Sequence, residues 1–118
     1  NEKLDSGKII SKKSLSLEGS LDEIFLRMEK NNLEIITNII SKKFKLSSQK
    51  GTPTYYKRRI PSQSELKDLN KSKLYMHNFI RMLADPYPNA YIKIGKKKII
   101  FKASKFDGKN LSFEGVIE

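Results

Sequence analysis

The sequence contains no cysteine and a single histidine, His77. Without cysteine, neither a disulfide framework nor a cysteine-ligated zinc site can form. A zinc site would have to be built almost wholly from carboxylates, which is an unusual ligand set. His77 also lacks the sequence surroundings of a Ser-His-Asp triad. We therefore expect no metal ion, and we interpret His77 as a structural or exposed helical residue.

Long apolar runs and glycine-rich phosphate loops are missing as well. The longest apolar stretches, such as residues 99–101, are far too short to cross a bilayer. No signal peptide is recognisable at the start of the chain. We therefore expect a cytoplasmic protein with no membrane partner. The only lysine-rich glycine turn, at Gly95, predicts a basic hairpin and not a phosphate loop.

Positive charge dominates the composition, with 24 Lys and Arg against 13 Asp and Glu and a formal net charge of +11. Such a balance attracts polyanions, for example nucleic acid, nucleotide phosphates or acidic membrane surfaces. The lysines are spread along the chain, however. A solvated, lysine-rich surface without a specific partner therefore explains the charge equally well.

The first half of the chain predicts short strands and one long helix. Apolar and polar residues alternate loosely over residues 8–17, and we expect one or two strands there. Ser20 and Glu23 form a capping box, in which each side chain satisfies a backbone N–H of the other residue. An apolar stripe at helical spacing then continues to Phe44. We expect this stripe to pack against a sheet.

The second half predicts a shorter helix and an antiparallel meander, which gives an α+β fold. The helix is expected over residues 71–83, and the prolines that follow it prevent its continuation. Residues 90–94 and 98–103 alternate around a turn and predict a hairpin, with a third strand over 111–117. The expected buried positions of the helix are Leu74, Tyr75, Phe79, Met82 and Leu83.

Two local features could carry chemistry. Asp5 lies in a turn before a predicted strand, a position that can aim a carboxylate into a cleft, although a turn-forming aspartate is the simpler explanation. Tyr56 stands next to Arg58 and Arg59 in a basic run. Guanidinium groups bind phosphates bidentately, and an aromatic ring can stack on a base or a sugar. This run therefore indicates an anion site, with a solvated charge run as the alternative.

Taken in order, these segments resemble the second half of the formyltransferase family. That family includes methionyl-tRNA formyltransferase and the formyltransferases of nucleotide-linked 4-amino sugars. The most specific segment is Ala84-Asp85-Pro86-Tyr87-Pro88, which is especially similar to the enzymes that formylate UDP-4-amino-4-deoxy-L-arabinose. The other segments that carry the resemblance are Asp5-Ser6-Gly7, the capped helix and Tyr56-Lys57-Arg58-Arg59-Ile60-Pro61.

The resemblance implies a fold and a reaction. Residues 1–53 would be the end of a Rossmann-like catalytic domain, and residues 54–118 a small C-terminal subdomain, for which a truncated OB-like barrel is one form. The reaction would transfer a formyl group from formyltetrahydrofolate, the co-substrate, to the amine of a nucleotide-linked amino sugar. Asp5 matches the family's catalytic aspartate, which can hold a histidine in place and help accept a proton.

Several expectations about the site and the partners follow from the same resemblance. Arg59 matches an arginine of the substrate site, and we expect Arg58 and Tyr56 to bind substrate with it. Ile60 replaces a threonine of the family, which removes a hydroxyl contact, and Asn89 replaces a common glycine. The family's catalytic Asn and His and most of its folate pocket lie upstream. We therefore expect a piece of a longer enzyme that is inactive alone and is partnered by the remaining N-terminal part, with a homodimer left open.

Two other functions stay open. Methionyl-tRNA formyltransferase suits the net charge of +11, but only 57 residues follow Pro61, which leaves little room for a complete tRNA-binding barrel. We therefore place tRNA behind the amino sugar as acceptor. A basic nucleic-acid-binding module without enzymatic activity is the third interpretation. Its tyrosines are too scattered to form a clear stacking platform.

Overall fold

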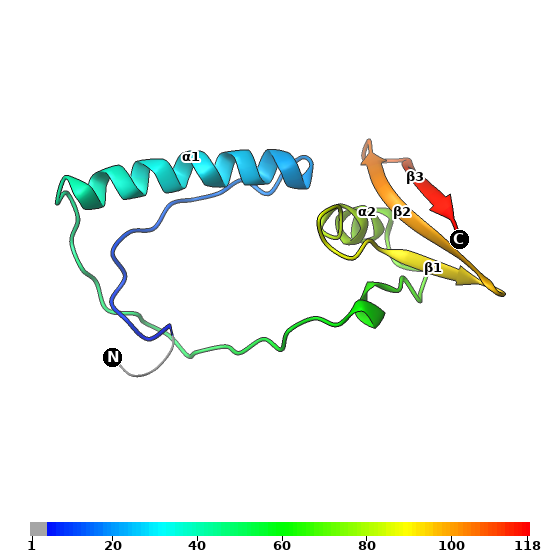
Figure 1. Ribbon diagram of the computed structural model, residues 1–118, viewed down its shortest axis with the longest axis horizontal. Helices are drawn as coiled ribbons and strands as arrows, with labels where there is room; N and C mark the ends of the chain where they lie inside the picture. The colour runs from blue at the N-terminus through cyan, green and yellow to red at the C-terminus, as the bar shows by residue number, and fades with distance from the viewer. Residues whose placement is uncertain (1–4) are drawn as a thin grey trace. The chain divides into compact units, whose positions relative to one another are not determined.

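The computed structural model describes residues 5–118 and divides the chain into two compact units, Asn1–Tyr56 and Lys57–Glu118. Its elements follow one another as α1, the 3₁₀ helix η1, α2, β1, β2 and β3 (Figure 1). The expected α+β class is confirmed. Among the described residues, neither α-helix combines the length and the apolar character that a membrane span requires.

The N-terminal unit is organised around α1, Leu21–Ile40. The predicted capping box is present, because the Ser20 hydroxyl accepts from the Glu23 N–H at 3.2 Å and the Ser20 N–H donates to the Glu23 carboxylate at 2.7 Å. Two acidic residues in the first turn suit the positive end of the helix dipole. The helix ends at Ile40, earlier than the expected Phe44, and Lys42 then takes a positive φ of 54°.

An extended segment before α1 lies along the helix (Figure 1) and is held by side chains of the helix. The contacts are Arg27 to the carbonyls of Ser16 (3.2 Å) and Glu18, Asn31 to the carbonyl of Ser14 (3.0 Å), and the ion pair of Glu34 with Lys13. The predicted strands over residues 8–17 are wrong. Only Ile9 pairs like a strand residue, in a single bridge to Ser47, and side chains of α1 bind the carbonyls of Ser14 and Ser16 instead.

The apolar stripe of α1 is not buried within residues 5–56. No residue of α1 is buried, and Met28, Ile36 and Ile40 of this stripe remain 40%, 53% and 76% exposed. Residues 5–56 contain no strand, so the expected packing of this stripe against a sheet does not occur within this unit and stays a prediction.

The C-terminal unit contains η1 (Pro61–Ser64), α2 (Lys73–Arg81) and a sheet of three antiparallel strands in the order β1-β2-β3. The strands are Tyr91–Ile94, Lys97–Phe106 and Leu111–Ile117, so the predicted meander is confirmed. Ser72 caps α2, since its hydroxyl accepts from the N–H of Tyr75 at 3.2 Å.

The core of this unit lies between α2 and the sheet. Its buried apolar residues are Leu66, Ile80, Leu83, Ala90 and Phe101. The prediction that Leu74, Tyr75 and Met82 are buried is wrong, because each is about half exposed. The predictions for Leu83, which is buried, and Phe79, which packs against the core, are confirmed. Met76 and Ile80 of α2 contact the core in place of the three wrong positions.

Candidate functional site

Asp5 lines a surface pocket of about 720 Å³ in the N-terminal unit, together with Ser6 and residues 49–55. The side-chain amide of Gln49 donates to the carbonyls of Asp5 at 2.7 Å and Gly7 at 2.8 Å. These two bonds hold the turn at Asp5 next to Gln49, another lining residue of the pocket. Asp5 has a positive φ of 54°, a conformation that aspartate adopts more readily than most residues. The exposed Asp5 residue can therefore offer a carboxylate to a ligand in this pocket.

The chemistry that this carboxylate can perform alone is narrow. An ionised carboxylate only accepts hydrogen bonds, so it can bind an amine or orient an imidazole. The N-terminal unit contains no histidine, since His77 belongs to the C-terminal unit. Among residues 5–118, no group of three His, Asp or Glu side chains could hold a metal ion.

A second pocket, of about 600 Å³, lies in the C-terminal unit, and we call it the arginine pocket. Two stretches that are 20 residues or more apart in sequence form its walls, the basic run before η1 and the loop after α2. Its lining residues are Arg58, Arg59, Ile60, Pro61, Ser64, Leu83, Tyr87 and Pro88. The two segments on which the family resemblance mainly rests therefore meet at one cavity.

The basic wall of the arginine pocket is fixed by Gln63. The Arg59 guanidinium donates to the Gln63 carbonyl at 2.7 Å, and the Ile60 N–H donates to the Gln63 side chain at 2.9 Å. The Arg59 guanidinium also lies 5.9 Å from the ring centroid of Phe79, within cation–π range. A guanidinium has five N–H donors, so Arg59 can be anchored and still bind a phosphate or carboxylate.

The aromatic residue of the arginine pocket is Tyr87, which we did not assign to the site from the sequence. Tyr56, the tyrosine expected to bind substrate, ends the N-terminal unit and is 91% exposed. Tyr87 stands in the Ala84–Pro88 segment that was used only to recognise the family. Tyr87 lies in a loop between two prolines, and this position is a sequence signal for a binding residue, since loops often carry such residues.

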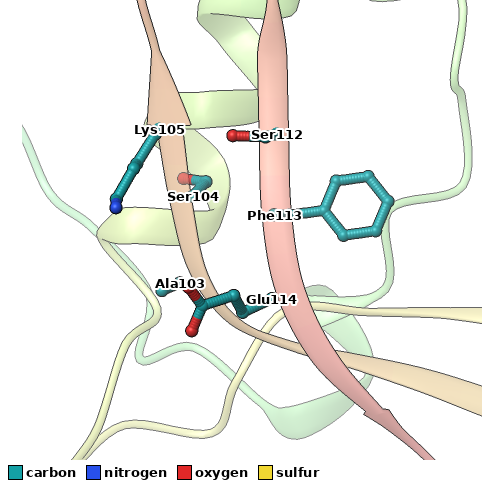
Figure 2. A pocket seen from close by; sticks show the side chains of 6 residues that line it. All are labelled: Ala103, Ser104, Lys105, Ser112, Phe113 and Glu114. Atoms are coloured by element: carbon teal, nitrogen blue, oxygen red, sulfur yellow. The ribbon is translucent and has the colours of Figure 1, made fainter.

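His77 has a structural environment. Its Nδ1 lies 2.9 Å from the Ser104 hydroxyl, which links α2 to β2. Burial lowers the pKa of His77 below its usual value, and the nearby positive charge of Arg81 lowers it further. Ser104 also borders a small cavity of about 170 Å³ on β2 and β3 (Figure 2). The charged side chains drawn there, Lys105 and Glu114, are exposed, and the cavity is too small for a nucleotide.

The small α+β unit with its arginine pocket matches a known class, the formyltransferase C-terminal domains. Residues 61–117 match the family model described as the methionyl-tRNA formyltransferase C-terminal domain. A solved structure, methionyl-tRNA formyltransferase from Clostridium thermocellum, is similar over 100% of this chain and 52% of its own, with 30% identity and a TM-score of 0.88. This chain thus spans about half the length of that protein.

Over residues 61–117 this chain is therefore similar to the C-terminal domain of the methionyl-tRNA formyltransferase family. The resemblance to formyltransferases is confirmed by both comparisons. Its narrower part, the similarity to the amino-sugar enzymes, receives no support from either of them.

Proposed function

We propose that this chain is the C-terminal part of a formyltransferase whose acceptor is methionyl-tRNA. The observation that carries the proposal is the 30% identity to methionyl-tRNA formyltransferase over the entire chain. The short stretch after Pro61 argued against a tRNA acceptor, but the family's C-terminal domain matches within residues 61–117. The charge also supports it, because residues 57–118 hold 14 Lys and Arg and only 6 Asp and Glu. Such a surface attracts the phosphates of RNA.

In the proposed reaction, the formyl carbon bonds to the acceptor amine nitrogen while its bond to the nitrogen of formyltetrahydrofolate breaks. The amine loses a proton in this step, and the folate nitrogen gains one. Asp5 would hold a histidine of the upstream domain in its useful state and help to accept the proton. The Asn, the His and most of the folate pocket would come from that domain, so the chain alone would be inactive.

The remaining part of the enzyme would also complete the fold. Residues 1–53 would close a Rossmann-like catalytic domain of a cytoplasmic enzyme, and residues 54–118 would form a subdomain related to an OB-like barrel. The exposed apolar stripe of α1 supports this view, because an uncovered stripe of this kind normally packs against another element. The formyltransferase from Clostridium thermocellum is about twice as long as this chain, which leaves room for such an element.

The arginine pocket would bind the acceptor. Arg58 and Arg59 would hold a phosphate, and Tyr87 would stack on a base or sugar. The arginine pocket also keeps a nucleotide-linked amino sugar as the second candidate acceptor. Its volume of about 600 Å³ falls in the usual range for small-ligand sites. The two segments that line it are those whose sequence is similar to the sugar enzymes.

The test is formyl transfer by the full-length enzyme, with labelled formyltetrahydrofolate and either methionyl-tRNA or UDP-4-amino-4-deoxy-L-arabinose as acceptor. We expect efficient transfer to methionyl-tRNA, with a KM that rises steeply with salt as phosphate contacts are screened. Transfer to the sugar nucleotide alone would assign the second acceptor. Transfer to neither would refute both.

A further inference from the structure

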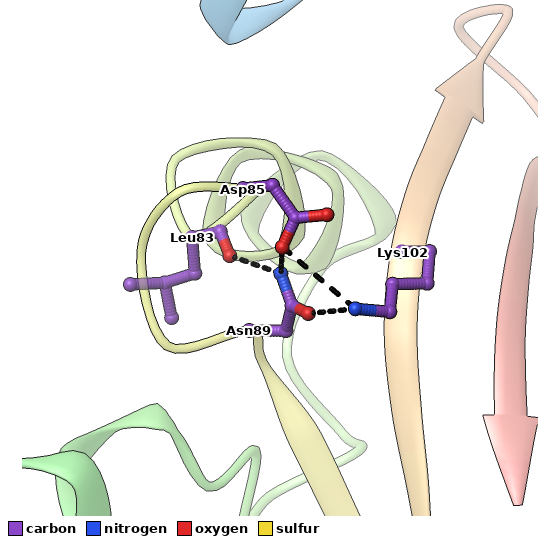
Figure 3. Close-up of polar contacts among 4 residues, drawn as sticks. All are labelled: Leu83, Asp85, Asn89 and Lys102. Atoms are coloured by element: carbon purple, nitrogen blue, oxygen red, sulfur yellow. Dashed lines mark hydrogen bonds and ion pairs between the residues drawn. The ribbon is translucent and has the colours of Figure 1, made fainter.

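A network of side chains holds the loop that carries Tyr87 (Figure 3). The Asn89 side-chain amide donates to the carbonyl of Leu83 at 3.0 Å and to the carboxylate of Asp85 at 3.2 Å. The ammonium group of Lys102 donates to the Asn89 side-chain oxygen at 2.5 Å and lies 3.7 Å from the Asp85 carboxylate. Asn89 thus joins both ends of the turn after α2 to a lysine of β2. We call Asp85, Asn89 and Lys102 the loop clasp.

Lys102 reaches the turn because it lies at an irregularity of the sheet. Phe101 is opposite Gly115 and Ala103 is opposite Glu114, so Lys102 has no partner on β3 and forms a bulge. A bulge of this kind re-aims the side chain of the extra residue. At Gly115 a Cβ atom would lie 2.5 Å from the Ile100 carbonyl oxygen. Only glycine permits this close approach of the two strands.

The loop is anchored on its other side as well. The Ser64 hydroxyl donates to the Pro88 carbonyl at 3.1 Å, and Ser64 is only 3% exposed. The N–H of Tyr87 donates to the Ala84 carbonyl at 3.1 Å. Ser64, Tyr87 and Pro88 all line the arginine pocket, whereas Asn89 and Lys102 do not. The clasp therefore holds the loop that carries Tyr87 and Pro88 without lining the pocket itself.

The contribution of Asn89 at this position comes from the hydrogen bonds of its side chain and not from an unusual backbone angle. Among the described residues other than glycine, positive φ values occur at Asp5 and Lys42 and not at Asn89. The amide group suits the position because it both donates and accepts. Its NH₂ group satisfies the Leu83 carbonyl, and its oxygen accepts from a cation, which makes that bond stronger than a neutral one.

We propose that Lys102, acting through Asn89, is a positioning residue that sets the Tyr87–Pro88 wall against Arg58 and Arg59. This inference rests on the proposed function of the arginine pocket as the acceptor site. Lys102 does not itself touch the acceptor. Its removal should weaken acceptor binding and leave the chemical step intact, since Asp5 and the upstream residues carry that step.

The experiment compares three variants of the full-length enzyme. Lys102→Met removes the ammonium and keeps much of the aliphatic stem, Lys102→Arg keeps a donor, and Lys105→Met removes one positive charge from the same strand. For Lys102→Met we expect the KM of the preferred acceptor to rise about tenfold, because small displacements of positioning groups are costly. Its kcat and its KM for formyltetrahydrofolate should stay within about twofold of wild type.

The controls separate positioning from simple attraction of an anionic acceptor. Lys102→Arg should recover most of the acceptor affinity, and Lys105→Met should resemble wild type. An equal rise of KM in Lys102→Met and Lys105→Met would overturn the proposal, because bulk charge would then explain both. A fall in kcat without a change in KM would overturn it too.

A second measurement does not depend on activity. Hydrogen exchange at the Tyr87 amide should be faster in full-length Lys102→Met than in wild type or Lys105→Met. Unchanged exchange would overturn the clasp even if the enzyme formylates methionyl-tRNA. The two proposals can fail separately. If the wild-type enzyme formylates neither acceptor, the proposed function is refuted. Faster exchange at the Tyr87 amide in Lys102→Met than in wild type would still support the role of the loop clasp in positioning the pocket wall.

Discussion

The Ser64 hydroxyl and the Pro88 carbonyl, 24 residues apart in the chain, form a hydrogen bond of 3.1 Å. It joins η1 to the loop after α2, and both elements contribute residues to the lining of the arginine pocket. Ser64 is also the buried polar residue of the described chain. A buried hydroxyl without a partner would be costly, so this bond stabilises the contact between η1 and the loop.

Replacing Ser64 by Ala should destabilise the C-terminal unit by about 1 kcal/mol, because the hydrogen bond from the buried Ser64 hydroxyl to the Pro88 carbonyl is lost. The measurement is hydrogen exchange at the core amide of Ile80 in the full-length enzyme, which reports the opening free energy of this unit. Ser62→Ala is the matched control, since Ser62 is an exposed residue of the same 3₁₀ helix. Identical exchange in both variants would show that the Ser64 bond contributes nothing.

Replacing Gly115 by Ala should have a larger effect. The added methyl group would lie 2.5 Å from the Ile100 carbonyl oxygen, so β2 and β3 would have to separate near the bulge. Overpacking of this kind costs about 1–3 kcal/mol. The same exchange experiment, read at Phe101, gives the size of the loss.

The control for that substitution is Gly7→Ala, because a Cβ atom at Gly7 would meet nothing within 4 Å and its φ is not positive. We expect wild-type exchange for this variant. A Gly115→Ala enzyme as stable as Gly7→Ala would mean that the strands tolerate a wider separation.

The parts of the fold that the sequence predicts are those encoded by neighbouring residues. The capping box of Ser20 and Glu23 and the three strands of the meander need only local signals, and all are confirmed. The strands expected over residues 8–17 fail because alternation alone provides no strand partner, and α1 side chains bind that segment instead. The buried face of α2 depends on the sheet beneath it, so the helical pattern alone predicts Phe79 and Leu83 correctly but not Leu74, Tyr75 and Met82.

The candidate site also contains residues that the sequence predicts and residues that depend on distant parts of the fold. The family resemblance singled out Arg58 and Arg59, and both line one pocket, although their role as substrate ligands stays a proposal. Tyr87 and Lys102 were not predicted. Lys102 reaches Asn89 through a bulge whose position is set by Gly115, a residue of another strand. Such long-range geometry leaves no local pattern in the sequence.

Asp5→Asn should abolish formyl transfer by the full-length enzyme and leave its fold intact. Asparagine keeps the size and the turn-forming capacity of aspartate but loses the negative charge that would orient a histidine and help accept a proton. We expect a loss of about 10²–10⁴-fold in kcat, the usual range for a general acid–base group. Single-turnover formylation with bound acceptor measures the chemical step directly.

Asp22→Asn is the charge-matched control for Asp5. Asp22 is an exposed carboxylate in the first turn of α1, and the capping box uses Glu23 instead. This variant should transfer formyl groups at the wild-type rate. Near-wild-type activity of Asp5→Asn would refute the catalytic assignment of Asp5.

The depressed pKa of His77 predicts how stability depends on pH. Burial disfavours the charged imidazole in the folded state, and the positive charge of Arg81 adds to this effect. As the pH falls below the ordinary value of 6.5, the unfolded chain therefore takes up a proton before the folded protein does. The stability that neutral His77 contributes is present above pH 6.5 and is lost as the pH falls through the lower, folded pKa.

The expected result is a C-terminal unit whose opening free energy decreases on acidification below pH 6.5, the ordinary pKa of the side chain. His77→Gln should flatten this dependence in the same window, because glutamine can still meet the Ser104 hydroxyl but does not titrate. Hydrogen exchange at Ile80, corrected for intrinsic rates at each pH, measures the effect. An NMR titration of the His77 ring gives its pKa directly. A His77 pKa above 6.5, or an equal slope in wild type and His77→Gln, would show that burial of this ring does not govern its protonation.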